Sequence, residues 1–149
     1  MTLIFTTIFF LIDISSKYII SKIVTLGNSI DIIKNFLRIS YVKNTGAAFS
    51  ILDGNTLFVT IIGIVIIIMI IWYLYKNKVN KMIDKIGYSL ILGGSIGNLF
   101  DRVCYGYVRD FIDIQIGEYN YPIFNLADSF IVIGVILLFI SAWRDKHGN

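Results

Sequence analysis

Four long apolar segments, separated by polar stretches, dominate the chain. They cover approximately residues 3–20, 56–75, 86–102 and 124–143. A helix needs about 20 apolar residues to span a bilayer, so the second and fourth segments are long enough on their own. The third is short and rich in glycine, and it must recruit residues beyond 100 or be shielded by its neighbours. The pattern predicts an all-α membrane protein with a bundle of four transmembrane helices.

Two features of these segments need an interpretation. Their many isoleucines would favour strands in water, but a backbone in lipid must satisfy its own hydrogen bonds, which favours helices. The first segment has the length of a signal peptide, yet it lacks a basic start and a small-residue cleavage site. We therefore expect it to be a spanning helix. Because no linker or repeat interrupts the chain, residues 1–149 are predicted to form a single domain.

A different pattern occurs between the first two segments. Residues 37–43, Leu-Arg-Ile-Ser-Tyr-Val-Lys, largely alternate between apolar and polar side chains. Alternation of this kind is typical of a strand with one buried face. The sequence thus predicts a small extracytoplasmic β-sheet, or cradle, between helices 1 and 2, lying on the membrane surface.

The composition agrees with a membrane protein. Of the 149 residues, 56% are hydrophobic and only 15% are charged, whereas soluble domains have about 25% charged residues. The single cysteine, Cys104, excludes an intramolecular disulfide and a metal site built from several cysteines. The net charge of +3 fits a role in membrane topology, and no motif for nucleic-acid binding is present.

The distribution of positive charge predicts the orientation. The connection between the second and third segments, residues 76–85, carries four lysines and one acid, and the C-terminal tail carries Arg144 and Lys146. Positively charged loops stay in the cytoplasm, so both termini are predicted to be cytoplasmic. Residues 21–55 and 101–122 then face outward. The first of these also holds four basic residues, so the denser lysine cluster decides the assignment.

Several polar residues accompany the apolar segments. Asp13 and Lys17 are four residues apart and share one face of the first helix. They form either the polar wall of a buried site or an ion pair that holds helices together. Residues 44–50, Asn-Thr-Gly-Ala-Ala-Phe-Ser, begin with Asn44 and Gly46, and by residue type they favour a turn. Asn44 could also bind a peptide backbone, because its amide both donates and accepts.

The third segment ends in a cluster of polar residues. Gly93 and Gly97 form a face of small residues that suits close helix packing. Asn98 and Arg102 share a helix face at its end. Arg102 is either a ligand for a carbonyl, carboxylate or head group, or an interfacial arginine paired with Asp101.

Carboxylates follow in the last third of the chain. Asp110 and Asp113 are three residues apart and would by default lie in a solvated loop. Asn125 and Asp128 fit the cap of the fourth helix. An alternative brings Asp128 next to Asp110. Two close carboxylates share a proton, and such a pair can activate water while donating to a carbonyl oxygen.

Taken in order, five blocks of this sequence resemble the signal peptidase II (prolipoprotein signal peptidase) family. The resemblance covers nearly the whole chain, and its strength lies in the order of the blocks. The blocks are Asp13 with Lys17; Asn44-x-Gly46-Ala47-Ala48-Phe49; Gly93-Gly94-x-x-Gly97-Asn98-x-x-Asp101-Arg102; Val108-x-Asp110-Phe111; and Phe124-Asn125-x-Ala127-Asp128.

The resemblance implies a function. The family cleaves bacterial lipoprotein precursors before the lipid-modified cysteine, using two aspartates and a water, and the resemblance therefore implies no metal and no cofactor. Asp110 and Asp128 match the catalytic positions. Substrate-binding or supporting roles are implied for the remaining polar positions, which are Asp13, Lys17, Asn44, Gly46, Asn98, Arg102 and Asn125.

The resemblance also implies the surroundings of the enzyme. Its partners are lipid-modified prolipoproteins, membrane lipids and inhibitors of the globomycin type, and we expect a monomer. The predicted location is the bacterial cytoplasmic (inner) membrane, with the active site near the outer face. Arg109 is a departure, because an apolar residue is common there. This cation either favours the ionised form of Asp110 or points to lipid head groups. Asp113 matches a frequent acid that is not catalytic in the family.

Two other classes of protein remain as alternatives. A small transporter or channel subunit would line an ion path with Asp13, Lys17 and Arg102. A non-catalytic assembly protein would bind a partner helix through the face formed by Gly93 and Gly97.

Overall fold

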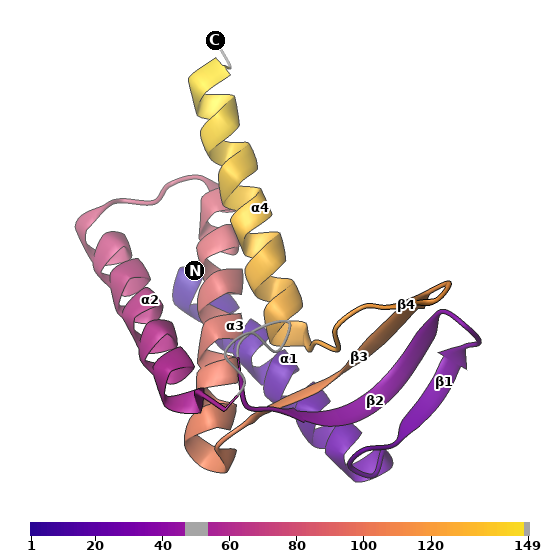
Figure 1. Cartoon of the computed structure of the whole chain (residues 1–149). Coiled ribbons are helices and arrows are strands. Elements are labelled where there is room, and N and C mark those ends of the chain that lie inside the picture. Colours follow the sequence, from indigo (N-terminus) through magenta and orange to yellow (C-terminus); the bar gives the residue numbers. More distant parts are fainter. Residues whose placement is uncertain (47–53, 148–149) are drawn as a thin grey trace.

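The structure is a computed structural model that describes residues 1–46 and 54–147. Within these residues, four helices and a small antiparallel sheet make up the fold (Figure 1). The helices are α1 (Thr2–Ile23), α2 (Thr56–Lys76), α3 (Met82–Tyr105) and α4 (Leu126–His147). Each overlaps one of the four predicted segments. The sheet lies at the end where α1 and α3 finish and where α2 and α4 begin.

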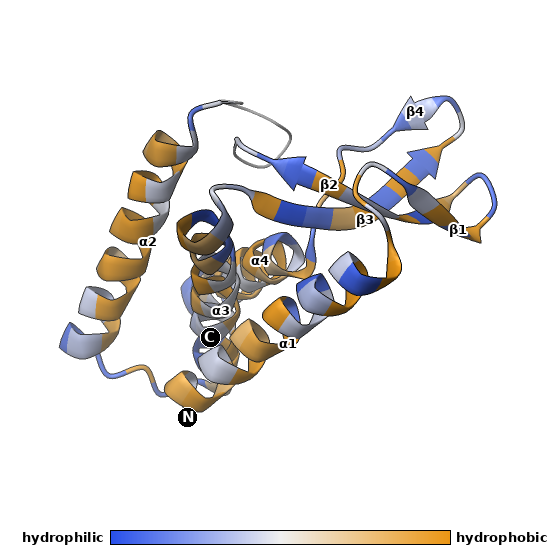
Figure 2. Ribbon diagram, turned by 90° about the horizontal axis from the view of Figure 1, so that it is seen from below, coloured by the Kyte–Doolittle hydropathy of each residue, from blue (hydrophilic) through white to orange (hydrophobic). Residues whose placement is uncertain are grey.

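Three of the described helices, α1, α2 and α4, are long and apolar enough to cross a membrane. Helix α2 shows the reason most clearly, because only Val59 and Ile67 along it are buried. Most of its other apolar side chains are exposed, and the ribbon of α2 has the colour of hydrophobic residues along most of its length (Figure 2). A helix with apolar side chains on every side is stable in lipid, where the backbone bonds only to itself.

Helix α3 does not reach this hydropathy, so its crossing of the membrane stays a prediction. It packs against each of the other three helices instead. Its glycines explain the close approach: a Cβ on Gly93 would lie 2.7 Å from Cβ of Phe9 in α1, and one on Gly94 would overlap the carbonyl oxygen of Ala127 in α4. The prediction that the Gly93 face serves helix packing is confirmed within the chain.

The sheet has four described strands in the order β1-β2-β3-β4, each antiparallel to its neighbour. They are β1 (Ser29–Ile33), β2 (Leu37–Asn44), β3 (Val108–Ile116) and β4 (Tyr119–Asn120). The predicted strand at residues 37–43 is thus confirmed. The predicted sheet between helices 1 and 2 accounts for β1 and β2 only, because β3 and β4 come from the connection between α3 and α4.

The default interpretation of residues 108–113 as a solvated loop is also wrong. Val108 and Phe111 are buried, and the polar side chains between them find partners inside the protein. Asp113 is one example. Its Oδ2 accepts hydrogen bonds from Oγ of Ser40 at 2.6 Å and from Nε of Arg38 at 3.1 Å, both on β2. These bonds help to fix the β2–β3 register.

That register positions the next pair of polar residues. Val42 lies opposite Asp110, and Asn44 lies opposite Val108. An irregularity between Ile39 and Val42 shifts the pairing there, which is typical of a bulge that re-aims side chains. The sheet therefore carries Asn44 and Asp110 together to the end of the helix bundle.

Candidate active site

Two carboxylates meet where the sheet joins the bundle. Asp110 comes from the third residue of β3 and is 1% exposed, whereas Asp128 lies in the first turn of α4 and is half-buried. Asn125 contacts both. Its Nδ2 donates to Oδ1 of Asp110 at 2.6 Å, and its backbone N–H donates to Oδ2 of Asp128 at 3.2 Å. One residue thus fixes the two carboxyl groups relative to each other.

The start of α4 explains how this pair is held. The Asp128 N–H donates to Oδ1 of Asn125 at 3.0 Å, which reciprocates the bond from Asn125 N–H to Asp128. This is a capping box. The predicted cap is therefore present, and its geometry also orients the Asp128 carboxylate and the Asn125 amide toward Asp110.

The end of β2 contributes the other partner of Asp110. Nδ2 of Asn44 donates to Oδ2 of Asp110 at 2.8 Å, while Oδ1 of Asn44 accepts the N–H of Gly46 at 2.9 Å. The predicted turn at Asn44 is thus found, and its side chain also binds Asp110. The carbonyl oxygen of Gly46 accepts a hydrogen bond from NH2 of Arg102 at 2.9 Å. The remaining residues of this motif, Ala47, Ala48, Phe49 and Ser50, lie outside the described part of the chain.

Helix α3 supplies the hub of the network. Nδ2 of Asn98 donates to Oδ1 of Asp128 at 2.8 Å. Oδ1 of Asn98 accepts from Nζ of Lys17 at 2.9 Å and from Nδ2 of Asn125 at 3.2 Å. Because Lys17 can only donate, it fixes which end of the Asn98 amide faces Asp128.

Helix α1 contributes a buried ion pair to the site. Nζ of Lys17 lies 2.7 Å from Oδ2 of Asp13, and both side chains are fully buried. Oδ1 of Asp13 accepts the N–H of Ala127 at 2.9 Å, at the start of α4. A Cβ on Gly97 would overlap the Asp13 carboxylate. The Asp13–Lys17 pair therefore agrees with both alternatives: it holds α1, α3 and α4 together, and it also binds Asn98 beside the two carboxylates.

Asp101 and Arg109 also belong to this region, although the sequence did not predict that they would pair with each other. Asp101 is fully buried, with Oδ2 3.7 Å from Nζ of Lys17 and with both oxygens bound to Arg109. Of the two alternatives for Arg102, the pair with Asp101 is not found, because Asp101 binds Arg109 instead. The buried Arg109 side chain is turned toward Asp101 rather than toward the surface. The signal for Asp101 was its helical phase, because it follows Gly94, Gly97 and Asn98 on one buried face.

The surroundings of Asp110 change its proton affinity. Burial away from water raises the pKa of this carboxyl, and the negative charge of Asp128 raises it further. Hydrogen bonds from Asn44 and Asn125, together with the charge of Lys17, lower it. The resulting pKa is about 7. Near neutral pH, Asp110 can therefore hold a proton.

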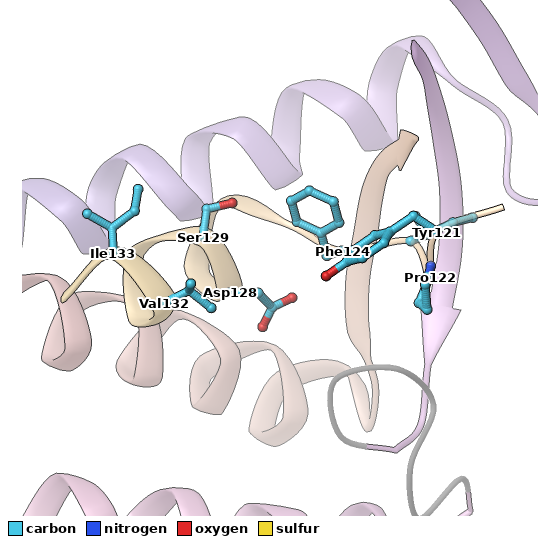
Figure 3. Close-up of a pocket in the computed structure, with 8 residues that line it drawn as sticks. Tyr121, Pro122, Phe124, Asp128, Ser129, Val132 and Ile133 are labelled. Carbon is cyan, nitrogen blue, oxygen red and sulfur yellow. The ribbon is translucent and has the colours of Figure 1, made fainter. Parts of the chain in front are cut away.

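Asp128 borders two cavities with apolar walls. One, of about 300 Å³, lies between α4 and the segment before it, and Figure 3 shows the Asp128 carboxylate beside Val132, Phe124 and Pro122 there. The other, of about 370 Å³, is a groove between α2, α3 and α4 that also reaches Arg102. A chain segment with apolar side chains could thus reach the Asp128 carboxylate through either cavity. Among the residues that the structure describes, no cluster of His, Cys, Asp or Glu is placed to hold a metal ion.

Comparison with known proteins agrees with this geometry. A sequence model of the family described as Signal peptidase (SPase) II matches residues 5–144. The chain belongs to the signal peptidase II family. Signal peptidase II relatives include the lipoprotein signal peptidases of Pasteurella multocida (strain Pm70) and Staphylococcus aureus (strain MRSA252), each 41% identical to this chain. The alignments cover 93% and 92% of this chain and 86% and 84% of the relatives.

Solved structures support the same assignment. Two structures of bacterial membrane enzymes, determined by the in meso method at 2.3 and 1.9 Å resolution, are similar in fold, with TM-scores of 0.90 and 0.84. They are 37% and 38% identical to this chain, covering 99% and 97% of it and 90% and 93% of their own chains. As a member of the signal peptidase II family, the chain is a protease, and its apolar helices are those of a membrane protein.

Proposed function

We propose that this protein is an intramembrane aspartic endopeptidase for diacylglyceryl-modified bacterial prolipoproteins. It removes the signal peptide by cutting before the lipidated cysteine, and Asp110 and Asp128 activate the attacking water. The observation that carries this proposal is that Asn125 binds both carboxylates beside apolar cavities. The relatives in Pasteurella multocida and Staphylococcus aureus are named for lipoprotein signal peptides, which supports the substrate class.

In this mechanism, Asp128 is the base and Asp110 is the acid. Asp128 takes a proton from water as the water oxygen bonds to the scissile carbonyl carbon, and Asp110 gives its proton to the carbonyl oxygen. The diol intermediate then collapses: Asp128 gives the proton it took from water to the leaving nitrogen, the C–N bond breaks, and Asp110 takes back a proton from a diol hydroxyl as the carbonyl forms again. The raised pKa of Asp110, about 7, supports its protonated role. Fixed amide donors around the pair stabilise the developing charge.

The supporting residues have distinct tasks. Asn44, Asn98 and Asn125 hold the carboxylates by hydrogen bonds, and Asp13 with Lys17 anchors them from α1. Gly46, whose carbonyl accepts from Arg102, offers backbone next to the dyad, where a substrate strand binds. The groove between α2, α3 and α4 accepts the signal helix of the precursor. No cofactor and no metal take part.

The location follows from the same arrangement. Helix α3 also spans the membrane, shielded from lipid by the other three helices. The sheet lies on the outer surface of the bacterial inner membrane. Both termini face the cytoplasm. The enzyme works as a monomer, and globomycin-like cyclic peptides inhibit it by occupying the space next to Asp128.

The test uses purified protein in detergent micelles with one prolipoprotein in two forms, with and without its diacylglyceryl group. We expect rapid cleavage of the modified form only, and mass spectrometry should find the lipidated cysteine as the new N-terminus. A matched precursor with serine in place of that cysteine should stay intact. Cleavage of all three forms alike, or at another bond, would contradict the assigned substrate.

A further inference from the structure

Arg109 lies next to the proposed catalytic Asp110 but turns away from it. Its backbone N–H and its Nε donate to Oδ2 of Asp101 at 3.0 and 3.1 Å, and its NH2 donates to Oδ1 at 2.6 Å. The guanidinium carbon lies 4.6 Å from the centre of the Tyr105 ring. Arg109 is 5% exposed and Asp101 is 0% exposed. A side chain held this closely is a built contact rather than a surface charge.

The turn between α3 and β3 makes this contact possible. Helix α3 ends at Tyr105, and Gly106 follows with a φ of +78°, the left-handed conformation that favours glycine at a helix end. The chain therefore reverses within a few residues and enters β3 at Val108. Arg109 then stands over the last turn of α3, where Asp101 points. The Arg109–Asp101 contact thus ties the beginning of β3, and with it Asp110, to α3.

Next to the Arg109–Asp101 pair, the charge of Lys17 is shared between two buried carboxylates. Lys17 lies between two buried carboxylates, with Nζ 2.7 Å from Oδ2 of Asp13 and 3.7 Å from Oδ2 of Asp101. Nζ also donates to Oδ1 of Asn98. Lys17 keeps its closer contacts to Asp13 and Asn98 because Arg109 neutralises Asp101. A buried carboxylate that lost its arginine would draw the nearest cation toward itself, and Lys17 is already within reach.

Asn98 connects this balance to the dyad, since it donates to Asp128 and accepts from Asn125, which binds Asp110. We propose that Arg109 is a positioning residue for catalysis: by neutralising Asp101 it leaves Lys17 on Asn98, and so keeps the amides that orient both carboxylates in place. This inference rests on the proposed function. It differs from a purely structural role, because the harm comes from the carboxylate left behind rather than from the lost bonds.

The experiment compares three variants in the micelle assay: Arg109→Met, Asp101→Asn, and the double variant with both changes. We expect Arg109→Met to lower kcat by about 30-fold with KM changed by less than about 3-fold, because the reacting groups and not substrate binding are disturbed. The double variant should recover about 10-fold of this loss, since the neutral amide that replaces the Asp101 carboxylate no longer attracts Lys17. Lys34→Met, which removes an exposed cation from the turn between β1 and β2, is the matched control and should behave as wild type.

Asp101→Asn separates this account from simple loss of stability. It breaks the same ion pair as Arg109→Met but leaves no carboxylate at position 101 to attract Lys17. We therefore expect its kcat to exceed that of Arg109→Met at equal folded fraction. Equal losses in both single variants and the double variant would overturn the inference, as would wild-type kcat in Arg109→Met. If Arg109→Met does not fold, recovery of folding and of kcat in the double variant supports the inference, and failure of both overturns it. A wild-type protein that leaves the lipidated precursor intact would instead overturn the proposed function, and this inference with it.

Discussion

Asn125 is the residue through which the two carboxylates are joined. Its side chain donates to Asp110 and its backbone to Asp128, and its Oδ1 caps the first turn of α4. Replacement by Ala removes the side-chain bonds but keeps the backbone one. We expect Asn125→Ala to lower kcat/KM by about 100-fold, since a hydrogen bond to a charged group contributes about 1.5–3 kcal/mol. Steady-state cleavage rates would show this, with Asn120→Ala on exposed β4 as the control; similar rates for both variants would count against it.

Asp110 gives a second prediction at this scale. Its pKa of about 7 means that the proposed acid loses its proton as the pH rises through 7. We expect kcat/KM to fall about tenfold per pH unit above about pH 7, because kcat/KM reports the free enzyme. Burial sets this pKa first, followed by the charge of Asp128, the amides of Asn44 and Asn125, and the charge of Lys17. A profile that rises through neutral pH would contradict the assignment of Asp110 as the acid.

The same pKa has a consequence for stability. A carboxyl whose pKa is higher in the folded than in the unfolded protein favours folding at low pH, and that contribution disappears as the pH rises through the folded-state value. The folded state should therefore lose stability between about pH 4 and about pH 7 through this group. Thermal unfolding of wild type and Asp110→Asn across this range measures it. The slope should be smaller in the variant, and identical slopes would exclude the effect.

At the scale of elements, the packing of α3 against α1 decides whether the site is supported. A Cβ on Gly97 would overlap the Asp13 carboxylate, whereas Gly63 in α2 has open space around it. We expect Gly97→Ala to destabilise the protein by about 1–3 kcal/mol, the usual cost of overpacking. Gly63→Ala should be neutral or slightly stabilising, because alanine is the better helix former. Thermal unfolding in micelles compares the pair, and equal shifts in Tm would contradict the close approach of α1 and α3.

The register of β2 and β3 is a further property of elements. Asp113 accepts from Ser40 and Arg38 across the two strands, three residues from Asp110. Asp113→Asn should keep part of the activity, because it weakens these bonds without touching the dyad. A reduction of about 10-fold in kcat/KM is the expected size. Loss as complete as in Asp110→Asn would reopen the choice of the catalytic acid.

The sequence predicted some helices and strands better than others. Hydropathy located the four helical segments, because lipid forces long apolar stretches to be helical, and alternation found β2. Neither pattern revealed β3, because its polar residues Arg109, Asp110 and Asp113 are typical of a loop. In the structure these residues are bound by Asp101, Asn125 and Arg38, respectively. Such partners are brought together only by the fold. The blocks of the resemblance located the candidate dyad, but the contact between Arg109 and Asp101 depends on the turn at Gly106.

For the whole molecule, orientation in the membrane is the main expectation. The sheet and the dyad lie at one end, and the lysine-rich connection between α2 and α3 lies at the other (Figure 1). Cys104 is the only cysteine in the sequence and is exposed in the last turn of α3. A membrane-impermeant maleimide should label it in intact cells from outside. The control carries Cys104→Ser with Lys78→Cys in the connection, and it should be labelled only after lysis; the reverse pattern would invert the topology.

The dyad is the centre of this account, and removal of each carboxylate tests it most directly. Asp110→Asn and Asp128→Asn would be compared with wild type and with Asp31→Asn, which changes an exposed carboxylate on β1. The measurement is single-turnover cleavage of a diacylglyceryl-modified prolipoprotein in micelles, with the folded fraction checked by thermal unfolding. The account predicts no product from either dyad variant and wild-type rates from Asp31→Asn. Normal turnover by a folded Asp110→Asn or Asp128→Asn variant would contradict the two-aspartate mechanism.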